Sequence, residues 1–308
     1  MTALLAGELR RLLSRRMIRV LALLAVAGIA LGGVLTFLST EKVSDAALRQ
    51  RAVDAQVRLD QCLRGVGPPP ATPNPKDNTL GPGADRDDLC RYRFDRVSDD
   101  RFKLEDLTDI LKVITAPLVI VAWVIGSSSI GAEWQARSIA TLLTWEPRRA
   151  RVLLAKILAS VIVACVFALL TWALLSAALL PSAFLHGTTA NTGGDWGRSL
   201  AAVVGRGTLM IAIATAIGFA VASIGRNTAA ALGVGFAYFL VIENVVGNFL
   251  AGFRRWLILG NSIVLIDGKD GGGDVAGRSV LAAGIYLTSV AVVLFAVATV
   301  LFRRRDVA

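Results

Sequence analysis

The chemistry available to this chain is narrow, because the residue types that usually carry catalysis are scarce. Its 308 residues include one histidine, His186, so a multi-histidine metal site is excluded and a Ser-His-Asp arrangement would need that single residue. No stretch matches the phosphate-binding pattern G-x-x-x-x-G-K-[ST]; Gly268-Lys269-Asp270 comes nearest and lacks the Ser or Thr. We therefore expect no catalytic residue, no metal ligand and no cofactor site in this chain, and do not expect an enzyme.

Two ionisable residues, Arg206 and Glu243, stand inside otherwise apolar stretches. A charge in the middle of a membrane costs about 2.5 to 3.5 kcal/mol on insertion scales unless it finds a partner or water. Both residues are expected in the outer half of their helices, so we predict an intramembrane ion pair between them. The alternative is that each side chain reaches the outer interface and water.

Two of the three cysteines, Cys62 and Cys90, fall in one polar segment, whereas Cys165 lies within an apolar stretch. Oxidised cysteine pairs persist outside the cytoplasm. We therefore predict a Cys62–Cys90 disulfide, with two free thiols as the alternative.

Six windows of the sequence are apolar over about 20 or more residues, the length that a helix needs to cross about 30 Å of hydrocarbon. The chain is 55% hydrophobic with a mean hydropathy of +0.61, above the roughly 45 to 50% apolar usage of globular domains. We therefore predict an all-α membrane protein with six transmembrane helices. Glu243 and Asn244 interrupt the fifth window, which we expect to be broken or re-entrant at its outer end. The windows cover residues 17–39, 108–130, 151–180, 199–224, 228–250 and 279–302.

The net charge of +10 comes from short basic runs beside these windows, at residues 10–19, 148–156 and 303–305. Six crossings put all these runs on one side, so the positive-inside rule predicts that both termini are cytoplasmic. The long polar stretch at 40–107 has 12 Lys or Arg and 13 Asp or Glu. This stretch therefore lacks the excess of positive charge that a nucleic-acid-binding surface needs, and nucleic acid is not an expected partner.

The segments outside the windows have distinct patterns. Residues 1–16 carry leucines at helical spacing opposite charged residues, which predicts a cytoplasmic amphipathic helix. This helix is expected to lie on membrane lipid, to contact a partner protein, or both. A cleaved signal peptide is disfavoured, because the first window is too long and no Ala-x-Ala site follows it. Residues 40–107 are expected to form a small extracytoplasmic subdomain between spans 1 and 2, and residues 303–308 a cytoplasmic tail.

Residues 131–150, which join the second and third windows, predict a short amphipathic helix on the cytoplasmic side. Ile139, Leu142 and Leu143 form an apolar stripe at i, i+3, i+4 spacing, and Pro147 should end the helix near Glu146. Lys156 follows in the first turns of the third span, from where its long side chain can extend to the interface. An ordinary basic loop is the alternative interpretation.

Four short motifs of this region resemble the coupling-helix region of ABC-2 type transporter permeases: Gly131-x-Glu133, Leu142-Leu143-Thr144, Pro147-Arg148-Arg149 and Lys156. With the six spans and the N-terminal helix, the resemblance covers nearly the whole chain. It implies a permease subunit of an exporter in the plasma membrane of a bacterial cell. The residues implied to couple the chain to an ATPase are Glu133, Trp134, Ser138, Ile139, Leu142, Leu143, Thr144, Glu146, Arg148 and Arg149.

The same resemblance implies the partners of the chain. A second permease chain, identical or homologous, would share a substrate route lined by the second and fifth spans. A separate ABC-type ATPase subunit would bind ATP and Mg²⁺. One rival interpretation is a non-transporting membrane scaffold or sensor whose external subdomain binds a ligand. A membrane-embedded enzyme is the other, and it lacks the clustered His, Asp, Glu or Cys that a catalytic cavity needs.

Overall fold

The computed structural model describes residues 2–40, 45–66, 85–94, 101–139, 148–190, 192–246, 249, 251–271 and 277–304. Over these residues the chain is helical apart from turns and one isolated β-bridge. Six helical segments are long and apolar enough to cross a membrane, so the predicted all-α, six-span architecture is confirmed. They are α2 (Arg16–Ser39), η1 (Leu104–Asp106) with α5 (Leu107–Gln135), α7 (Arg149–Leu185), α8 (Gly194–Gly225), α9 (Thr228–Ala237) with η2 (Tyr238–Val246), and α12 (Val280–Arg304).

The chain divides into two compact units. The first comprises Met1–Gly33, Glu105–Ala178 and Ala190–Ala308, and it contains most of the apolar helices. The second comprises Val34–Leu104 and Leu179–Thr189. The division falls within the residue ranges of α2 and α7.

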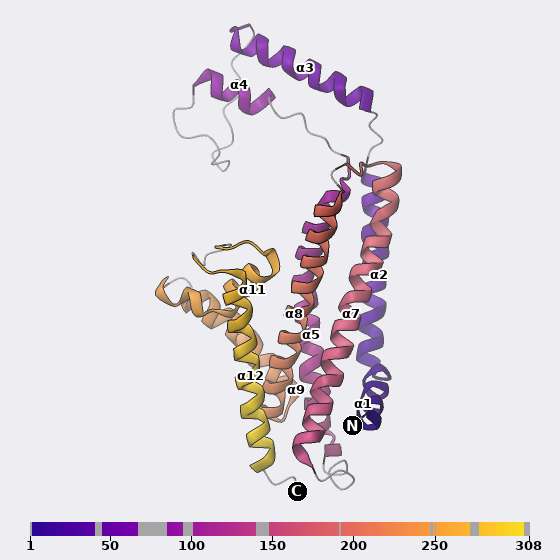
Figure 1. Ribbon diagram of the computed structural model, residues 1–308, viewed down its shortest axis with the longest axis vertical. Helices are drawn as coiled ribbons and strands as arrows, with labels where there is room; N and C mark the ends of the chain where they lie inside the picture. Colours follow the sequence, from indigo (N-terminus) through magenta and orange to yellow (C-terminus); the bar gives the residue numbers. More distant parts are fainter. Residues whose placement is uncertain are drawn as a thin grey trace. The chain divides into compact units, whose positions relative to one another are not determined.

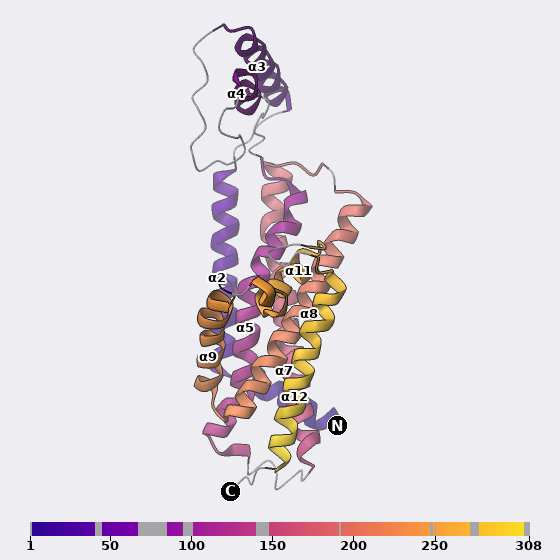
Figure 2. The ribbon, with the colours of Figure 1, turned by 90° about the vertical axis from the view of Figure 1, so that its left-hand side faces the viewer.

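Within the first unit, α5 and α8 pack side by side along the middle of the helix bundle (Figures 1 and 2). Their backbones approach closely because glycines lie at the contact. A Cβ atom on Gly126 of α5 would overlap the carbonyl of Thr215, and one on Gly218 of α8 would lie 2.6 Å from the carbonyl oxygen of Trp123. Small residues permit this kind of packing in membranes, where van der Waals contact rather than burial from water joins helices. α12 and α9 then pack against α8.

The fifth window changes its helix type along its length. It begins as α9, whose N-terminus is capped by the side chain of Asn227, and continues as the π-helix η2. A short helix, η3 (Ala251–Trp256), and then α11 (Ile258–Asp267) follow. At 1.5 Å per residue the ten residues of α11 span about 15 Å, too little to cross a bilayer. α11 packs against α8 and α12 instead.

The N-terminal helix α1 (Thr2–Leu13) packs Leu5, Leu9 and Leu12 against the bundle. Leu12 is buried in an apolar cluster with Ile18 of α2 and with Ala159 and Val163 of α7. Leu13, on another side of α1, is exposed. The apolar face of α1 therefore packs on protein in this structure.

The second unit contains a helical hairpin closed by a disulfide. α3 (Asp45–Leu63) and α4 (Arg86–Phe94) are joined by a bond between Cys62 and Cys90, whose Cα atoms are 5.8 Å apart. Both sulfur-bearing side chains are buried, so the predicted disulfide is confirmed. His186, the single histidine, stacks on the ring of Phe37 at 4.4 Å in the same unit. Its ring is half-buried in this contact, and the residue lies in the turn that follows α7.

Candidate functional site

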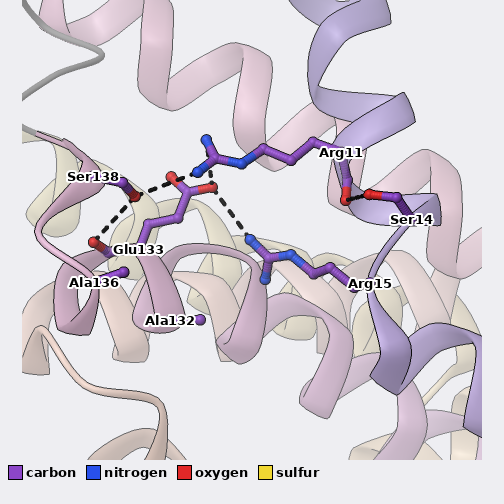
Figure 3. Close-up of a pocket in the computed structure, with 7 residues that line it drawn as sticks. All are labelled: Arg11, Ser14, Arg15, Ala132, Glu133, Ala136 and Ser138. Atoms are coloured by element: carbon purple, nitrogen blue, oxygen red, sulfur yellow. Dashed lines mark hydrogen bonds and ion pairs between the residues drawn. The ribbon is translucent and has the colours of Figure 1, made fainter.

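A buried carboxylate, Glu133, lies at the centre of the most highly charged cluster that the structure describes. It is near the end of α5, and only 3% of its side chain is exposed. Its Oε1 atom is 3.2 Å from Nη2 of Arg15 and 3.3 Å from Nη1 of Arg11. Figure 3 shows both guanidinium groups directed at this carboxylate from the N-terminal segment of the chain. Glu133 thus ties the end of α5 to α1 and to the turn after it.

Lys156 closes the cluster from the side of α7. Its Nζ atom is 2.7 Å from Oε2 of Glu133 and 2.8 Å from Oε1 of Glu8, and 2% of its side chain is exposed. The contact with Glu133 is an ion pair without hydrogen-bond geometry, whereas Lys156 donates a hydrogen bond to Glu8. The expected extension of Lys156 to the interface is therefore wrong. The ammonium group of Lys156 is enclosed by helices, where water cannot solvate it, and the carboxylates of Glu8 and Glu133 compensate its charge instead.

Arg15 also binds the backbone of α5. Its Nη1 donates to the carbonyl of Ser128 at 2.6 Å, and its Nη2 donates to the carbonyl of Ser129 at 3.2 Å. Burial lowers the pKa of Arg15 below its ordinary value, and the neighbouring carboxylate of Glu133 partly offsets this effect. An arginine side chain is so strongly basic that it keeps its charge at neutral pH. The corner between α1 and α2 is therefore fixed to α5 by charge-assisted hydrogen bonds.

The cluster carries one surplus positive charge, because its three cations face two carboxylates. Three members of the cluster, Arg11, Arg15 and Glu133, line a pocket of about 400 Å³. Arg11, 43% exposed, is the most accessible charge there, and its Nη2 donates to Oγ of Ser138 at 3.4 Å. The pocket is lined by Arg11, Ser14, Arg15, Ala132, Glu133, Ala136 and Ser138.

Trp134 occupies the opposite side of the same turn. Its ring contacts Phe302 of α12 edge-on, with centroids 5.9 Å apart. Arg226, in the turn between α8 and α9, lies over the Trp134 ring with its Cζ atom 4.9 Å from the centroid. Such cation–π and aromatic contacts contribute about 0.5 to 1.5 kcal/mol each. Trp134 therefore joins the end of α5 to two further helices.

Two contacts of neighbouring residues reinforce this arrangement. Ile139 is 1% exposed and packs in an apolar cluster with Ile130, Leu153, Phe219 and Phe302. Gln135 donates a hydrogen bond to Oδ1 of Asn227, the residue that caps α9. Residues 133–139 thus contact α1, α7, α12 and the α8–α9 turn. We name this group of contacts the basal junction.

The predicted coupling residues fall into three groups. Glu133, Trp134, Ser138 and Ile139 belong to the basal junction. Arg148 is exposed beside the start of α7, and Arg149 directs Nη1 at the carbonyls of Phe302 and Arg303, each 3.5 Å away. The other four, Leu142, Leu143, Thr144 and Glu146, lie outside the residues that the structure describes.

Neither the amphipathic pattern of residues 1–16 nor the motif that includes Lys156 indicates that Glu8, Arg11, Arg15 and Lys156 surround Glu133. Glu8 offered the one usable signal, because it is the only acidic residue in the first 40 and stands among leucines and arginines. An acidic residue in such a basic segment needs a cation beside it when it is buried. Which cation serves could be learned only from the packing of α1 on α7.

Arg206 and Glu243 are not brought together in the structure. Glu243 accepts a hydrogen bond from the backbone N–H of Leu259 at 2.8 Å, at the N-terminus of α11. At the same end of α11, the hydroxyl of Tyr238 accepts a hydrogen bond from the backbone N–H of Ile258 at 3.1 Å. Arg206 instead lies against Gly268, the residue that caps the C-terminus of α11. These two charged side chains therefore meet opposite ends of one helix.

A comparison with protein-family models gives one match, to a family described as ABC-2 family transporter protein, over residues 2–264. A search of curated protein sequences found no match. The matched region extends from α1 to α11, so it contains every residue of the basal junction except Phe302.

Proposed function

The chain belongs to the ABC-2 family of transporter proteins, and we propose that it is a permease subunit driven by ATP hydrolysis in separate nucleotide-binding subunits. The family supports a membrane-spanning transporter component, and the six apolar helices agree with a membrane location. The chain itself has no Walker-type phosphate-binding loop. ATP and Mg²⁺ therefore belong to the partner ATPase in this proposal.

The observation that carries the proposal is the basal junction. A partner that moves residues 133–146 moves a segment with three links to other helices. Glu133 links it to α1 through Arg11 and to α7 through Lys156, and Trp134 links it to α12. Packed elements with discrete arrangements move as rigid bodies and do not deform continuously. A displacement at this one segment is thus passed to several spans at once.

The buried charges give the junction a defined position. Removing one member of a buried ion pair leaves an uncompensated charge and costs about 3 to 5 kcal/mol. Intermediate positions of Glu133, in which its contacts are only partly made, are therefore disfavoured. These contacts hold the helices in one defined arrangement. In the proposal, an ATP-driven displacement of residues 133–146 replaces it by a second one, as an alternating-access transporter requires.

The proposed assembly contains two permease chains, identical or homologous, each with an ATPase subunit on the cytoplasmic side. The basic runs at both termini and at residues 148–156 support cytoplasmic termini. Family resemblance supports export as the direction of transport and a bacterial cell membrane as the location. The substrate would pass between the two permease chains, along the second and fifth spans.

Copurification tests the proposal. The tagged chain is purified from the membranes of its own cells, and nucleotide hydrolysis and the identity of bound proteins are measured. We expect an ABC-type ATPase in the preparation, with much less of it bound to the double variant Leu142→Ala, Leu143→Ala. The variant Glu133→Gln should retain the ATPase but hydrolyse ATP several-fold more slowly. Asp195→Asn, at a position that is 94% exposed in an i,i+3 pair with Arg198, is the control.

The result also separates the proposal from a membrane scaffold or sensor. A scaffold would copurify without a nucleotide-hydrolysing protein, and that outcome would overturn the permease proposal. If the ATPase binds equally well to the Leu142 and Leu143 variant, the chain is still a permease but residues 133–146 are not its docking segment.

A further inference from the structure

Arg206 is a charged side chain in a membrane-spanning helix that no described residue neutralises. It makes no ion pair and no hydrogen bond within the part of the chain that the structure describes, and its Nε atom is buried without a partner. An arginine in such a position needs an anion or water, because burial of an unpaired charge is costly. A guanidinium group has five donors arranged to bind a phosphate or carboxylate with two parallel hydrogen bonds.

The backbone beside Arg206 leaves space for its guanidinium group. A Cβ atom at Gly268 would overlap the guanidinium, so glycine is required for the two to lie together. Gly268 also has a φ of +70°, a conformation that favours glycine. Two acidic residues, Asp267 and Asp270, lie within two residues of Gly268 in the sequence. Asp270 accepts a hydrogen bond from the backbone N–H of Val280 at the start of α12, and neither residue forms an ion pair with Arg206 in the part of the chain that the structure describes.

An apolar groove lies one helical turn along α8 from Arg206, because Leu209 is one of its lining residues. It has a volume of about 550 Å³ and lies between α8, α11 and α12. It follows α12 from Val280 to Val292, which corresponds to about 18 Å at 1.5 Å per residue. The lining residues are Leu209, Leu265, Val280, Leu281, Gly284, Ile285, Thr288, Ser289 and Val292.

Two helices independently place Arg206 at one end of this groove. Leu209 of the lining lies three residues after Arg206, which is one turn along the same face of α8. Leu265 lies three residues before Gly268, the residue that Arg206 contacts. Val280, where α12 begins, marks the same end of the groove. A cation with unused donors therefore stands at the mouth of a long apolar slot.

We propose that this groove binds an anionic phospholipid, with an acyl chain along α12 and the phosphate on Arg206. The apolar lining suits a hydrocarbon chain, and the surplus charge of Arg206 favours a headgroup with net negative charge over a zwitterionic one. The site lies on membrane-spanning helices, where lipid is the most abundant ligand of this chemistry. The proposal concerns α8, α11 and α12 and does not depend on coupling to an ATPase.

Lipid binding to the purified full-length chain tests this proposal. The probes are phosphatidylglycerol, phosphatidylcholine and diacylglycerol with identical dioleoyl chains, and retained lipid is counted by native mass spectrometry. We expect the wild type to prefer phosphatidylglycerol by about tenfold or more over diacylglycerol, with phosphatidylcholine between them. Arg206→Gln should bind all three lipids alike. Arg198→Gln, which removes an exposed arginine of the same helix, should leave the preference unchanged.

A second pair of variants tests the groove itself. Gly284 lies in the lining, and a Cβ atom there would make ordinary contact with Leu265, so a leucine at this position would occupy part of the groove. Gly284→Leu is expected to lose all three lipids, whereas Gly233→Leu, on a helix face with open space, should keep them. Equal retention of phosphatidylglycerol and diacylglycerol by the wild type, or an unchanged preference in Arg206→Gln, would overturn the proposal. Lipid retention by Gly284→Leu would likewise exclude this groove.

Discussion

Glu243 and Arg206 lie at opposite ends of the same helix, α11. The carboxylate of Glu243 accepts the backbone N–H of Leu259 in the first turn, and the guanidinium of Arg206 lies against Gly268 beyond the last turn. An anion at the N-terminus and a cation at the C-terminus both interact favourably with the helix dipole and stabilise the helix. α11 begins after Leu257, which has no capping side chain, so its free N–H groups depend on partners from η2. The two charges thus hold a short helix that is too brief to be stable alone.

This arrangement predicts that Glu243 and Arg206 act independently. Glu243→Ala should destabilise α11 by about 1 kcal/mol, as expected for a lost carboxylate cap, and should speed hydrogen exchange of its first-turn amides. In a double-mutant cycle with Arg206→Gln, the two effects should add within about 0.5 kcal/mol. A coupling energy well above that value would restore the direct ion pair that the sequence suggested. The measurement is unfolding temperature in detergent together with mass-spectrometric hydrogen exchange.

The free energy of unfolding should depend far more on the buried lysine of the basal junction than on a paired cation at the surface. Lys156→Met leaves Glu8 and Glu133 without their shared cation, so we expect a loss of about 3 to 5 kcal/mol in the free energy of unfolding. Arg64→Met provides the control, because Arg64 pairs with Asp60 and the two side chains are 77% and 68% exposed. Exposed pairs of this kind contribute less than about 1 kcal/mol. Similar unfolding temperatures for the two variants would show that Lys156 is not buried between carboxylates.

The contact between α5 and α8 should not accept an added methyl group. In Gly126→Ala the new Cβ would overlap the backbone of Thr215, so the helices must separate and stability should fall by about 1 to 3 kcal/mol. Gly233→Ala adds the same methyl group to α9 where nothing lies within 4 Å. This control should be neutral or slightly stabilising. Thermal unfolding of both variants in one detergent compares them directly.

The disulfide leaves one thiol, that of Cys165, available to alkylation. Maleimide labelling of the denatured, unreduced chain should therefore add one label, and labelling after reduction should add three. Cys62→Ser should loosen the α3–α4 hairpin by about 3 to 4 kcal/mol in the chain-entropy model, seen as faster proteolysis of this segment. Two or more labels without reduction would show that the bond does not form in the cell.

The proposed orientation predicts which single cysteines can be labelled in intact cells. In a background without native cysteines, Asp195→Cys at the start of α8 should react with a membrane-impermeant maleimide added outside. Ala6→Cys, on an exposed side of α1, should react only after the membrane is opened. The opposite pattern would invert the topology and remove residues 133–146 from the reach of a cytoplasmic ATPase.

Much of the architecture follows from the sequence alone. Each apolar window must form its own helix, because backbone groups in hydrocarbon need internal hydrogen bonds. Window length and charge therefore determine the number of spans without knowledge of their packing. The Cys62–Cys90 bond was also predictable, because these two cysteines share one polar segment. The resemblance to ABC-2 permeases rested on residues 131–156, and the family match confirms it.

Only the tertiary structure decided which charges meet. Arg206 and Glu243 looked like partners by depth, but depth says nothing about the direction in which a side chain leaves its helix. In the structure Glu243 contacts the N-terminus of α11, and Arg206 contacts the residue after its last turn. Glu8 and Arg15 lie more than 100 residues before Glu133, and Lys156 belongs to another helix. The spacing of residues along the sequence therefore does not indicate that they cluster with Glu133. Hydropathy is a property of each segment by itself, whereas a buried ion pair depends on how two helices are rotated against each other.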